Sequence, residues 1–250
     1  MNRLAQHREF GEHRSVTSRT YERLRNAIVT ARFRPGEKLR IDSLREEFDA
    51  SLGAVREALA ALTAERLVTA EPQRGFSISL ISRKDLLDLT EARIQIELTC
   101  LDSSIRHGDL DWEGRVLSAS HQLSKVTCAL HDVESPDAET WHRYHALFHD
   151  AITSACTNDW WLRLRSQLYD QSERYRRLSG PIPVEERDID AEHRTIADAV
   201  LARDAEGAKA LLARHFMATT EILLGSPTLF ADERPGDRPA TATAARTRRT

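Results

Sequence analysis

The chain has 250 residues, of which 40% are hydrophobic and 30% are charged, with only 10 glycines and 8 prolines. This composition excludes a globally disordered chain and favours helices over a many-turned β-sandwich or barrel. No apolar run approaches the roughly 18 residues of a membrane span, and the first 15 residues are too polar for a secretory signal. Together with the odd number of cysteines, these features predict a cytoplasmic protein with no membrane partner.

The first third of the chain is predicted to contain three helices and a hairpin. Residues 1–17 lack hydrophobic periodicity, and we expect a mobile N-terminal arm. Pro35-Gly36 turns the chain after the first helix, and Asp42 and Ser51 are the expected N-caps of the next two. The elements that we expect are a helix over Ser18–Ala31, a short helix from Asp42, a helix after Ser51, and strands over Leu67–Ala70 and Phe76–Leu80.

From Ser82 to about residue 225 the sequence has helical character throughout. Short connections between the helices are typical of an antiparallel bundle. Residues 226–250 are rich in Ala, Thr, Arg and Pro, and we expect a disordered tail. The expected helices cover Ser82–His107, Trp112–Leu130, Ser135–Ala155, Asn158–Gly180, Val184–Ala202 and Ala205–Leu224.

Charge is distributed unevenly between these two parts. Residues 1–81 carry 14 Lys and Arg against 11 Asp and Glu, whereas residues 82–225 carry 17 against 25. A basic part beside an acidic part indicates two domains with different partners. We therefore expect a mainly α protein, in which residues 18–81 form a winged helix-turn-helix and residues 82–225 form an all-helical antiparallel bundle.

Three short helices and a hairpin on a basic segment are typical of a DNA-binding winged helix. A turn at Asp49-Ala50 would let the third helix enter a major groove by its N-terminus. Arg56, one turn into that helix, would then reach a phosphate or a guanine; the alternative is a surface ion pair with a neighbour such as Glu57. The hairpin tip would reach the minor groove. The DNA-contacting candidates are Arg40, Ser51, Gly53, Arg56, Arg74 and Gly75.

This segment resembles the DNA-binding domain of the GntR family of bacterial repressors. The resemblance covers residues 18–80 and rests on motifs that include Pro35-Gly36-Glu37-Lys38-Leu39, Val55-Arg56-Glu57-Ala58-Leu59 and Arg74-Gly75. It implies a homodimer that binds a pseudo-palindromic double-stranded operator. Leu52 departs from the family pattern, because it stands where a base-reading arginine is usual. Its side chain would meet a thymine methyl or pack inward, and we favour inward packing.

Four of the ten histidines form a pattern in the helical part. His145 and His149 are four residues apart, so they share one helix face, and His193 and His215 lie in the middle of the last two helices. An antiparallel bundle could bring all four to one point, where imidazoles suit Zn, Ni, Cu or Fe. The alternative is that each histidine is an ordinary residue with one hydrogen bond. His142 also lies near the same face.

The helical part resembles the FCD domain of the FadR-type subfamily of GntR regulators. The resemblance covers residues 82–224 and rests on Glu91–Glu97, on Phe148-His149 with Asn158, and on Glu192-His193-Arg194 and Arg214-His215-Phe216. In that family an Asp one turn before the Phe-His histidine completes a metal site with three histidines, and here that position is His145. The resemblance implies a divalent transition metal held by His145, His149, His193 and His215; the alternative is a weaker site of the last three histidines. Imidazole ligands favour Zn or Ni as that metal.

The same resemblance implies a small carboxylate effector beside the metal. Arg93 is the expected second contact, since guanidinium binds carboxylate through two hydrogen bonds; the alternative is an ion pair within the protein. We therefore predict a ligand-responsive transcriptional regulator, a repressor by family expectation, and not an enzyme. The alternatives are a metal sensor without organic effector and a metal-dependent enzyme. No glutamate follows His145, so the His-Glu-x-x-His motif of metalloproteases is missing.

Overall fold

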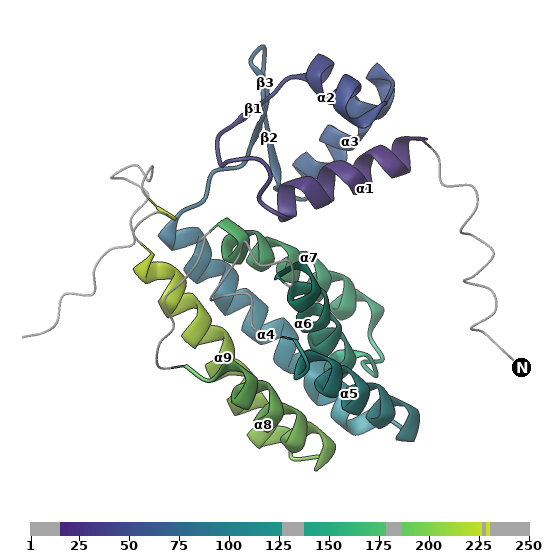
Figure 1. Ribbon diagram of the computed structural model, residues 1–250, viewed down its shortest axis with the longest axis vertical. Coiled ribbons are helices and arrows are strands. Elements are labelled where there is room, and N and C mark those ends of the chain that lie inside the picture. The colour runs from purple at the N-terminus through teal and green to yellow at the C-terminus, as the bar shows by residue number, and fades with distance from the viewer. Residues whose placement is uncertain (1–15, 127–137, 179–186, 227–228, 231–250) are drawn as a thin grey trace, which may run out of the picture.

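The computed structural model describes residues 16–126, 138–178, 187–226 and 229–230 (Figure 1). It is mainly helical, as predicted. A small winged-helix part lies at one end of a larger bundle of helices, and helix α1 lies over helix α7. The elements of the winged-helix part are α1 (Val16–Val29), β1 (Lys38–Leu39), α2 (Ile41–Phe48), α3 (Leu52–Ala64), β2 (Val68–Glu71) and β3 (Gly75–Ile78).

The predicted caps and turn explain how α3 is positioned. Ser51 is the N-cap of α3, and its hydroxyl accepts a hydrogen bond from the backbone N–H of Ala54 at 3.1 Å. Asp49 ends α2 with a left-handed conformation (φ 49°), which turns α3 away from α2. The apolar face of α3 then packs on α1 around Leu24, Ile28 and Leu59, which are fully buried.

The sheet holds the hairpin against this helical core. Its strand order is β1-β3-β2, and both pairs are antiparallel. The pairing of Val68 with Ile78 puts both side chains in the core, whereas the distal end of the hairpin is exposed. Gly75 (φ 86°) follows the turn at that distal end, in a conformation that glycine adopts at little cost.

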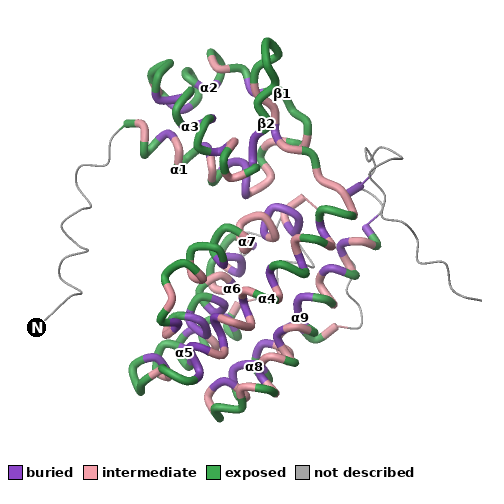
Figure 2. The backbone as a smooth tube through the Cα atoms, turned by 180° about the vertical axis from the view of Figure 1, so that it is seen from behind, coloured by how far each residue is buried: buried purple, intermediate pink, exposed green. Residues whose placement is uncertain are grey.

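The bundle consists of helices with buried faces that meet in one core. Trp112, Trp141 and Phe148 are its largest fully buried side chains. Buried residues run along the inner faces of the bundle helices (Figure 2). Among the described residues, no helix is long and apolar enough to cross a membrane. The bundle elements are α4 (Arg83–His107), α5 (Leu110–Leu123), α6 (Ala138–Thr153), α7 (Asp159–Leu178), α8 (Ile189–Leu201) and α9 (Ala205–Gly225).

Several local predictions need correction. Asp42 is not the N-cap of α2; that position is Arg40, which makes no side-chain capping bond. Helix α5 begins at Leu110 rather than Trp112, because the Asp109 carboxylate caps it by accepting from the Trp112 N–H at 2.8 Å. Strand β1 was not predicted. Helix α5 ends at Leu123 rather than Leu130, since Ser124 is its C-cap. Helix α8 begins at Ile189 rather than Val184, because the Asp188 carboxylate caps it by accepting from the Ala191 N–H at 2.7 Å. The expected helix ends at Ser135 and Gly180 lie outside the described residues.

The expectation of a disordered tail is wrong for two residues after α9. Leu229 and Phe230 are buried in a small apolar cluster with Leu86 of α4, Tyr175 of α7 and Leu223 of α9. The Phe230 ring also lies 4.6 Å from the guanidinium carbon of Arg83. The chain therefore folds back over the start of α4 after α9 ends, since these two side chains are among the few apolar ones in the tail. Residues 231–250 and 1–15 lie outside the described residues.

Candidate metal centre and DNA interface

Helices α6, α8 and α9 bring the four predicted histidines together. One nitrogen each from His145, His149, His193 and His215 lies within 4.8 Å of the others. The Nε2 atoms of His145 and His149 are 3.2 Å apart. Two nitrogens bound to one tetrahedral ion at Zn–N distances of about 2.0–2.1 Å would be about 3.3 Å apart. The four side chains are also buried, so the cluster has the composition and spacing of a metal centre.

The hydrogen bonding of the cluster distinguishes a metal site from ordinary core histidines. Both ring nitrogens of His193, and the Nδ1 atoms of His145 and His149, are buried without a hydrogen-bond partner in the described structure. A buried polar atom left unpaired costs about 1–3 kcal/mol. The alternative in which each histidine holds one hydrogen bond therefore fails for His193. A metal ion would bind one nitrogen of each imidazole and would so give His193 a partner.

The electrostatics of the cluster keep the imidazoles neutral. Burial lowers the pKa of His145, His149 and His193 well below 6.5, and neighbouring imidazoles lower it further. Burial also lowers the pKa of His215, although the hydrogen bond to Glu192 opposes this shift. Neutral imidazole is the form that binds metal. At pH 7 the four nitrogens are therefore available as ligands.

Glu192 orients one of the four histidines, a role that sequence reasoning missed. Its Oε2 accepts a hydrogen bond from His215 Nδ1 at 2.8 Å and pairs with Arg187 Nη2 at 2.6 Å. A carboxylate on the far nitrogen fixes the tautomer of a metal-binding histidine and raises its basicity. Glu192 stands next to His193 in the sequence, but its contact with His215 depends on how α8 packs on α9. A cleft of about 300 Å³ between these helices reaches both side chains.

Aromatic side chains wall the cluster, and His142 is not part of it. Trp141 stacks on His145 with ring centroids 4.6 Å apart, and Phe148 lies 5.1 Å from His193. The Nδ1 atom of His142 lies 2.8 Å from a carboxylate oxygen of Glu173. His142 is thus paired with α7 instead of joining the other four histidines.

Arg93, the predicted effector contact, lies beside the cluster and also makes the ion pair that was its alternative role. Its Nε is 3.3 Å from Glu97, and its Nη1 donates to the Ser172 hydroxyl at 2.7 Å. Its guanidinium carbon lies 4.1 Å from the ring centroid of Phe216, whose ring also lies 5.5 Å from that of His149. Burial lowers the pKa of Arg93 to about 10.

Two further buried arginines reach the same region from α7. Arg165 donates to Glu97 at 2.8 Å and to Asp150 at 2.6 Å, and Arg176 pairs with Glu173. Of these carboxylates only Glu97 and Glu173 are buried, because the Asp150 side chain is 63% exposed. The region thus holds three buried guanidinium groups and two buried carboxylates.

Two of these arginines have a nitrogen that could donate a hydrogen bond to an anion. One terminal nitrogen of Arg93 and one of Arg165, in each case Nη2, are buried without a hydrogen-bond partner in the described structure. Both arginines also lower the pKa of His149, which places their charges near the histidine cluster. Sequence alone could not rank Arg165 against Arg143. The structure separates them, since Arg143 is exposed and stacks on Tyr144 at 4.8 Å.

The predicted DNA-contacting residues lie on the exposed surface of the winged helix. Arg40, Gly53 and Arg56 are exposed at α2 and in the first turns of α3. Among the described residues, Arg56 makes no ion pair with Glu57 or any other carboxylate, so that alternative is not observed. Leu52 is 41% exposed, so the expectation that it packs inward is wrong.

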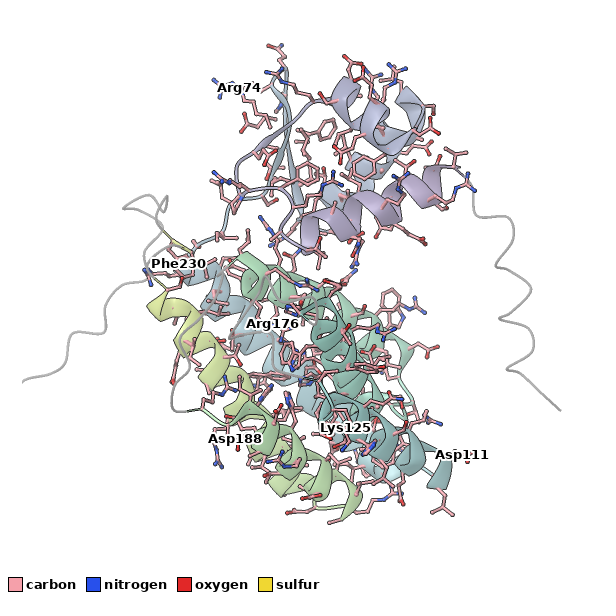
Figure 3. The ribbon with its side chains drawn as sticks, viewed as in Figure 1. Arg74, Asp111, Lys125, Arg176, Asp188 and Phe230 are labelled. Carbon is pink, nitrogen blue, oxygen red and sulfur yellow. The ribbon has the colours of Figure 1, made fainter. Side chains whose placement is uncertain are left out.

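The hairpin tip presents a second exposed cation. The Arg74 side chain is 79% exposed, and its nearest carboxylate oxygen, on Glu71, is 3.7 Å away. Arg74 lies at the tip of the hairpin, at the end of the molecule far from the bundle (Figure 3). Gly75 follows it directly and is exposed as well.

Family comparisons match both parts of the chain. The family described as "Bacterial regulatory proteins, gntR family" matches residues 16–78, and the family described as "FCD domain" matches residues 88–218. The chain belongs to the GntR family. It is a transcriptional regulator of the subgroup with a C-terminal FCD domain, and it is not an enzyme.

Individual relatives agree with this assignment to the GntR family. The chain is 38% identical over 210 residues to the uncharacterized HTH-type transcriptional regulator BphR of Paraburkholderia xenovorans (strain LB400), covering 84% of this chain and 86% of that protein. It is 35% identical over 207 residues to the HTH-type transcriptional repressor GlaR of Escherichia coli (strain K12), covering 81% of this chain and 93% of that protein.

Solved structures of GntR-type regulators share the fold. E. coli McbR/YncC matches with a TM-score of 0.71 at 20% identity, covering 85% of this chain and 98% of that chain. A putative GntR regulator from Rhodococcus sp. RHA1 matches with a TM-score of 0.68 at 25% identity, covering 84% and 98%. The arrangement of a winged helix on a helical bundle is thus common to this GntR protein and its relatives.

Proposed function

We propose that this GntR-family protein represses transcription in response to a small carboxylate that binds beside a metal ion at the histidine cluster. The observation that carries the proposal is the set of four convergent, buried imidazoles whose ring nitrogens include four without a partner. Repression is supported by the name of the E. coli relative GlaR, which is a transcriptional repressor.

The metal would be held by His145, His149, His193 and His215. Zn or Ni is the proposed occupant, because an all-imidazole set lacks the carboxylates that Mg and Mn prefer. A bound ion would supply a Lewis-acid centre for a carboxylate oxygen. The protein itself keeps the four imidazoles neutral by burial and orients His215 through Glu192.

The effector would complete the charge balance of the arginine group. Arg93 and Arg165 each have a buried terminal nitrogen without a partner in the described structure, and a carboxylate could accept hydrogen bonds from both. Because the site is buried and walled by Phe216 and Tyr169, only a small anion fits the proposal.

The operator would be bound by a homodimer through residues 18–81, while residues 82–225 would hold the effector and form the dimer. Arg40, Ser51, Gly53 and Arg56 would face a major groove, and Arg74 with Gly75 an adjacent minor groove. With α3 in the major groove, the exposed Leu52 would contact a thymine methyl. The dimer's two-fold symmetry would match a pseudo-palindrome.

The test is a titration of chelator-treated protein with Zn or Ni, followed by a series of small mono- and dicarboxylates. Operator binding is read by fluorescence anisotropy on a duplex that the wild-type protein selects from random sequence. We expect one ion per chain and at least one carboxylate that weakens DNA binding only in the metal-loaded protein. The variant Arg93→Gln should keep the metal and lose the carboxylate response.

Two results would overturn parts of this proposal. If metal alone changes DNA binding and no carboxylate adds to it, the protein is a metal sensor without organic effector. If neither metal binds at neutral pH, the histidines form a polar pocket and the metal assignment is wrong.

A further inference from the structure

We propose that α7 carries the state of the histidine cluster to the DNA-binding domain through a polar joint made by Asp170, Gln171 and Arg174. The inference rests on the proposed function, because it assigns how occupancy of the metal site reaches the winged helix. It depends on two sets of contacts that α7 makes, one with the winged helix and one with α6.

The outer face of α7 is bound to α1 and to the end of α3. The Asp170 carboxylate pairs with Arg25 of α1, and Arg25 Nε lies 2.8 Å from Oε2 of Glu65, the residue that ends α3. The Gln171 side-chain amide donates to the backbone carbonyl of Glu65 at 2.8 Å. The helix whose N-terminus presents Arg56 is therefore held at its other end by α7.

Arg174 extends the joint to the sheet. It is only 3% exposed, and its guanidinium donates to the backbone carbonyl of Ser79, just after β3. The three joint residues thus contact α1, the end of α3 and the segment after β3. A groove of about 850 Å³ beside the joint is lined by residues of both domains, among them Gln171, Arg174 and Ser79. The domains are not packed tightly against each other at this groove, so a shift of the joint would change the tilt of the winged helix.

Side chains of α7 also reach α6 before and after its metal-binding histidines. Three side-chain pairs join the helices: Arg177 and Glu139 at 2.6 Å, Glu173 and His142 at 2.8 Å, and Arg165 and Asp150 at 2.6 Å. Between the first two pairs and the third, α6 carries His145 and His149. A shift of α6 that accompanies metal binding would move α7 with it.

The two sets of contacts lie close together on α7. Asp170 of the joint is three residues before Glu173, so the two side chains are neighbours on the helix surface. A helix moves as a unit when neighbouring elements shift by about 1–2 Å at an interface. Side-chain pairs thus join α7 to the histidine-bearing helix α6, while the joint joins it to the winged helix that it lies under (Figure 1).

The experiment compares the full-length wild type with the double variant D170N/R174Q and the matched control R163Q. Arg163 is an exposed arginine of the same helix that stacks on Trp160 and takes no part in the joint. Zinc affinity and DNA affinity with and without zinc are measured on the selected duplex. We expect zinc to change wild-type and R163Q DNA affinity by about fivefold or more. In D170N/R174Q the change should fall below about twofold, with zinc affinity retained.

A second measurement tests the joint without relying on the metal. Spin labels are attached at Ala60→Cys on α3 and at Ser118→Cys on α5, in a protein in which Cys128 is changed to Ser. The distance between the two labels reports the distance between the domains. Unlabelled protein is added in excess so that each measured pair lies within one chain. We expect one narrow distribution in the wild type and a broad one in D170N/R174Q.

Different results would contradict the joint and the proposed function. If zinc binds but the double variant responds to it like the wild type, or if zinc leaves wild-type DNA affinity unchanged, the joint does not transmit the signal. If zinc never binds, the proposed function fails, and an unchanged distance distribution in the double variant would then also remove the joint.

Discussion

The two domains of this GntR protein use arginine in opposite ways. In the winged helix, Arg56 and Arg74 are exposed; Arg56 has no carboxylate partner in the described structure, and Arg74 has Glu71 at 3.7 Å. In the bundle, Arg93, Arg165 and Arg176 are buried among carboxylates and aromatic rings. Exposed arginines are suited to binding a polyanion such as DNA, because they displace its counterions. Buried arginines are suited to binding one small anion, and salt screens that interaction little.

The histidines deepen this contrast. The bundle gathers four imidazoles into a buried, neutral cluster, and each neighbouring positive charge makes their protonation harder. A neutral cluster beside guanidinium groups with buried, unpartnered nitrogens is suited to a metal and an anion together. The two regions should therefore respond differently to salt, to pH and to substitution.

The largest effect should follow from removing one ligand of the proposed metal site. His193→Ala should weaken metal binding by more than the roughly 100-fold that loss of an outer-shell partner costs. The variant should remain a helical protein, because His193 makes no hydrogen bond that the change would break. Elemental analysis and circular dichroism check both points. The exposed His121→Ala on α5 is the control; metal retained at full stoichiometry in His193→Ala would place the site elsewhere.

Arg56→Ala tests whether the exposed arginines of the winged helix bind DNA. Loss of a guanidinium contact to a guanine or phosphate should cost about 1–3 kcal/mol of DNA affinity. If the contact is to phosphate, the slope of log affinity against log salt should fall by about one. Anisotropy at several salt concentrations measures both, with the exposed Arg115→Ala in the bundle as control. Affinity equal to that of the wild type would remove Arg56 from the reading surface.

Glu192→Gln sharpens the account of the cluster, since it changes a carboxylate that touches only one of the four histidines. Metal affinity should fall by about 10–100-fold, because the amide no longer fixes His215 with a negative charge. Isothermal titration with zinc measures this, and the exposed Glu221→Gln on α9 is the control. A loss as large as that of His193→Ala would mean that Glu192 is itself a ligand.

The stability of the metal-free protein should also depend on pH. The folded-state pKa values of the four histidines are lowered, so the unfolded chain takes up protons first as pH falls below about 6.5. The stability present above that pH should then fall by up to about 1.4 kcal/mol per pH unit for each histidine that stays neutral. Glu192, with a pKa lowered to about 2, adds a loss only below about pH 4.5.

Urea unfolding between pH 7 and 5 measures this dependence. The slope should be smaller in His193→Ala, which has one fewer histidine to protonate. An equal slope in the variant would show that His193 is not kept neutral by the fold.

The parts of the fold that could be predicted depend on local chemistry. Ser51 and Ser82 cap their helices as expected, because a serine before an apolar helical stretch acts within one turn. Strand β1 could not be predicted, since Lys38 and Leu39 are too short a run and become a strand only by pairing with β3. Leu52 was assigned inward from its apolar side chain, although its position in the first turn of α3 leaves it exposed.

The candidate site, too, has a part that could be predicted from the sequence and a part that could not. The spacing of His145 and His149, with the motifs around His193 and His215, was sufficient to predict the cluster. The partners of those residues were not visible in the sequence. Arg176 and Glu192 gain their roles only when α7 packs on α4 and α8 packs on α9, and no local pattern distinguishes them from surface charges.

The most direct test of the central claim is X-ray absorption at the metal edge of full-length protein purified at neutral pH and supplied with Zn or Ni. The account predicts one tightly bound ion per chain, with imidazole nitrogens at about 2.0–2.1 Å for zinc and no protein carboxylate in the first shell. Absence of a stoichiometric ion, or a shell dominated by oxygen, would contradict the four-histidine site.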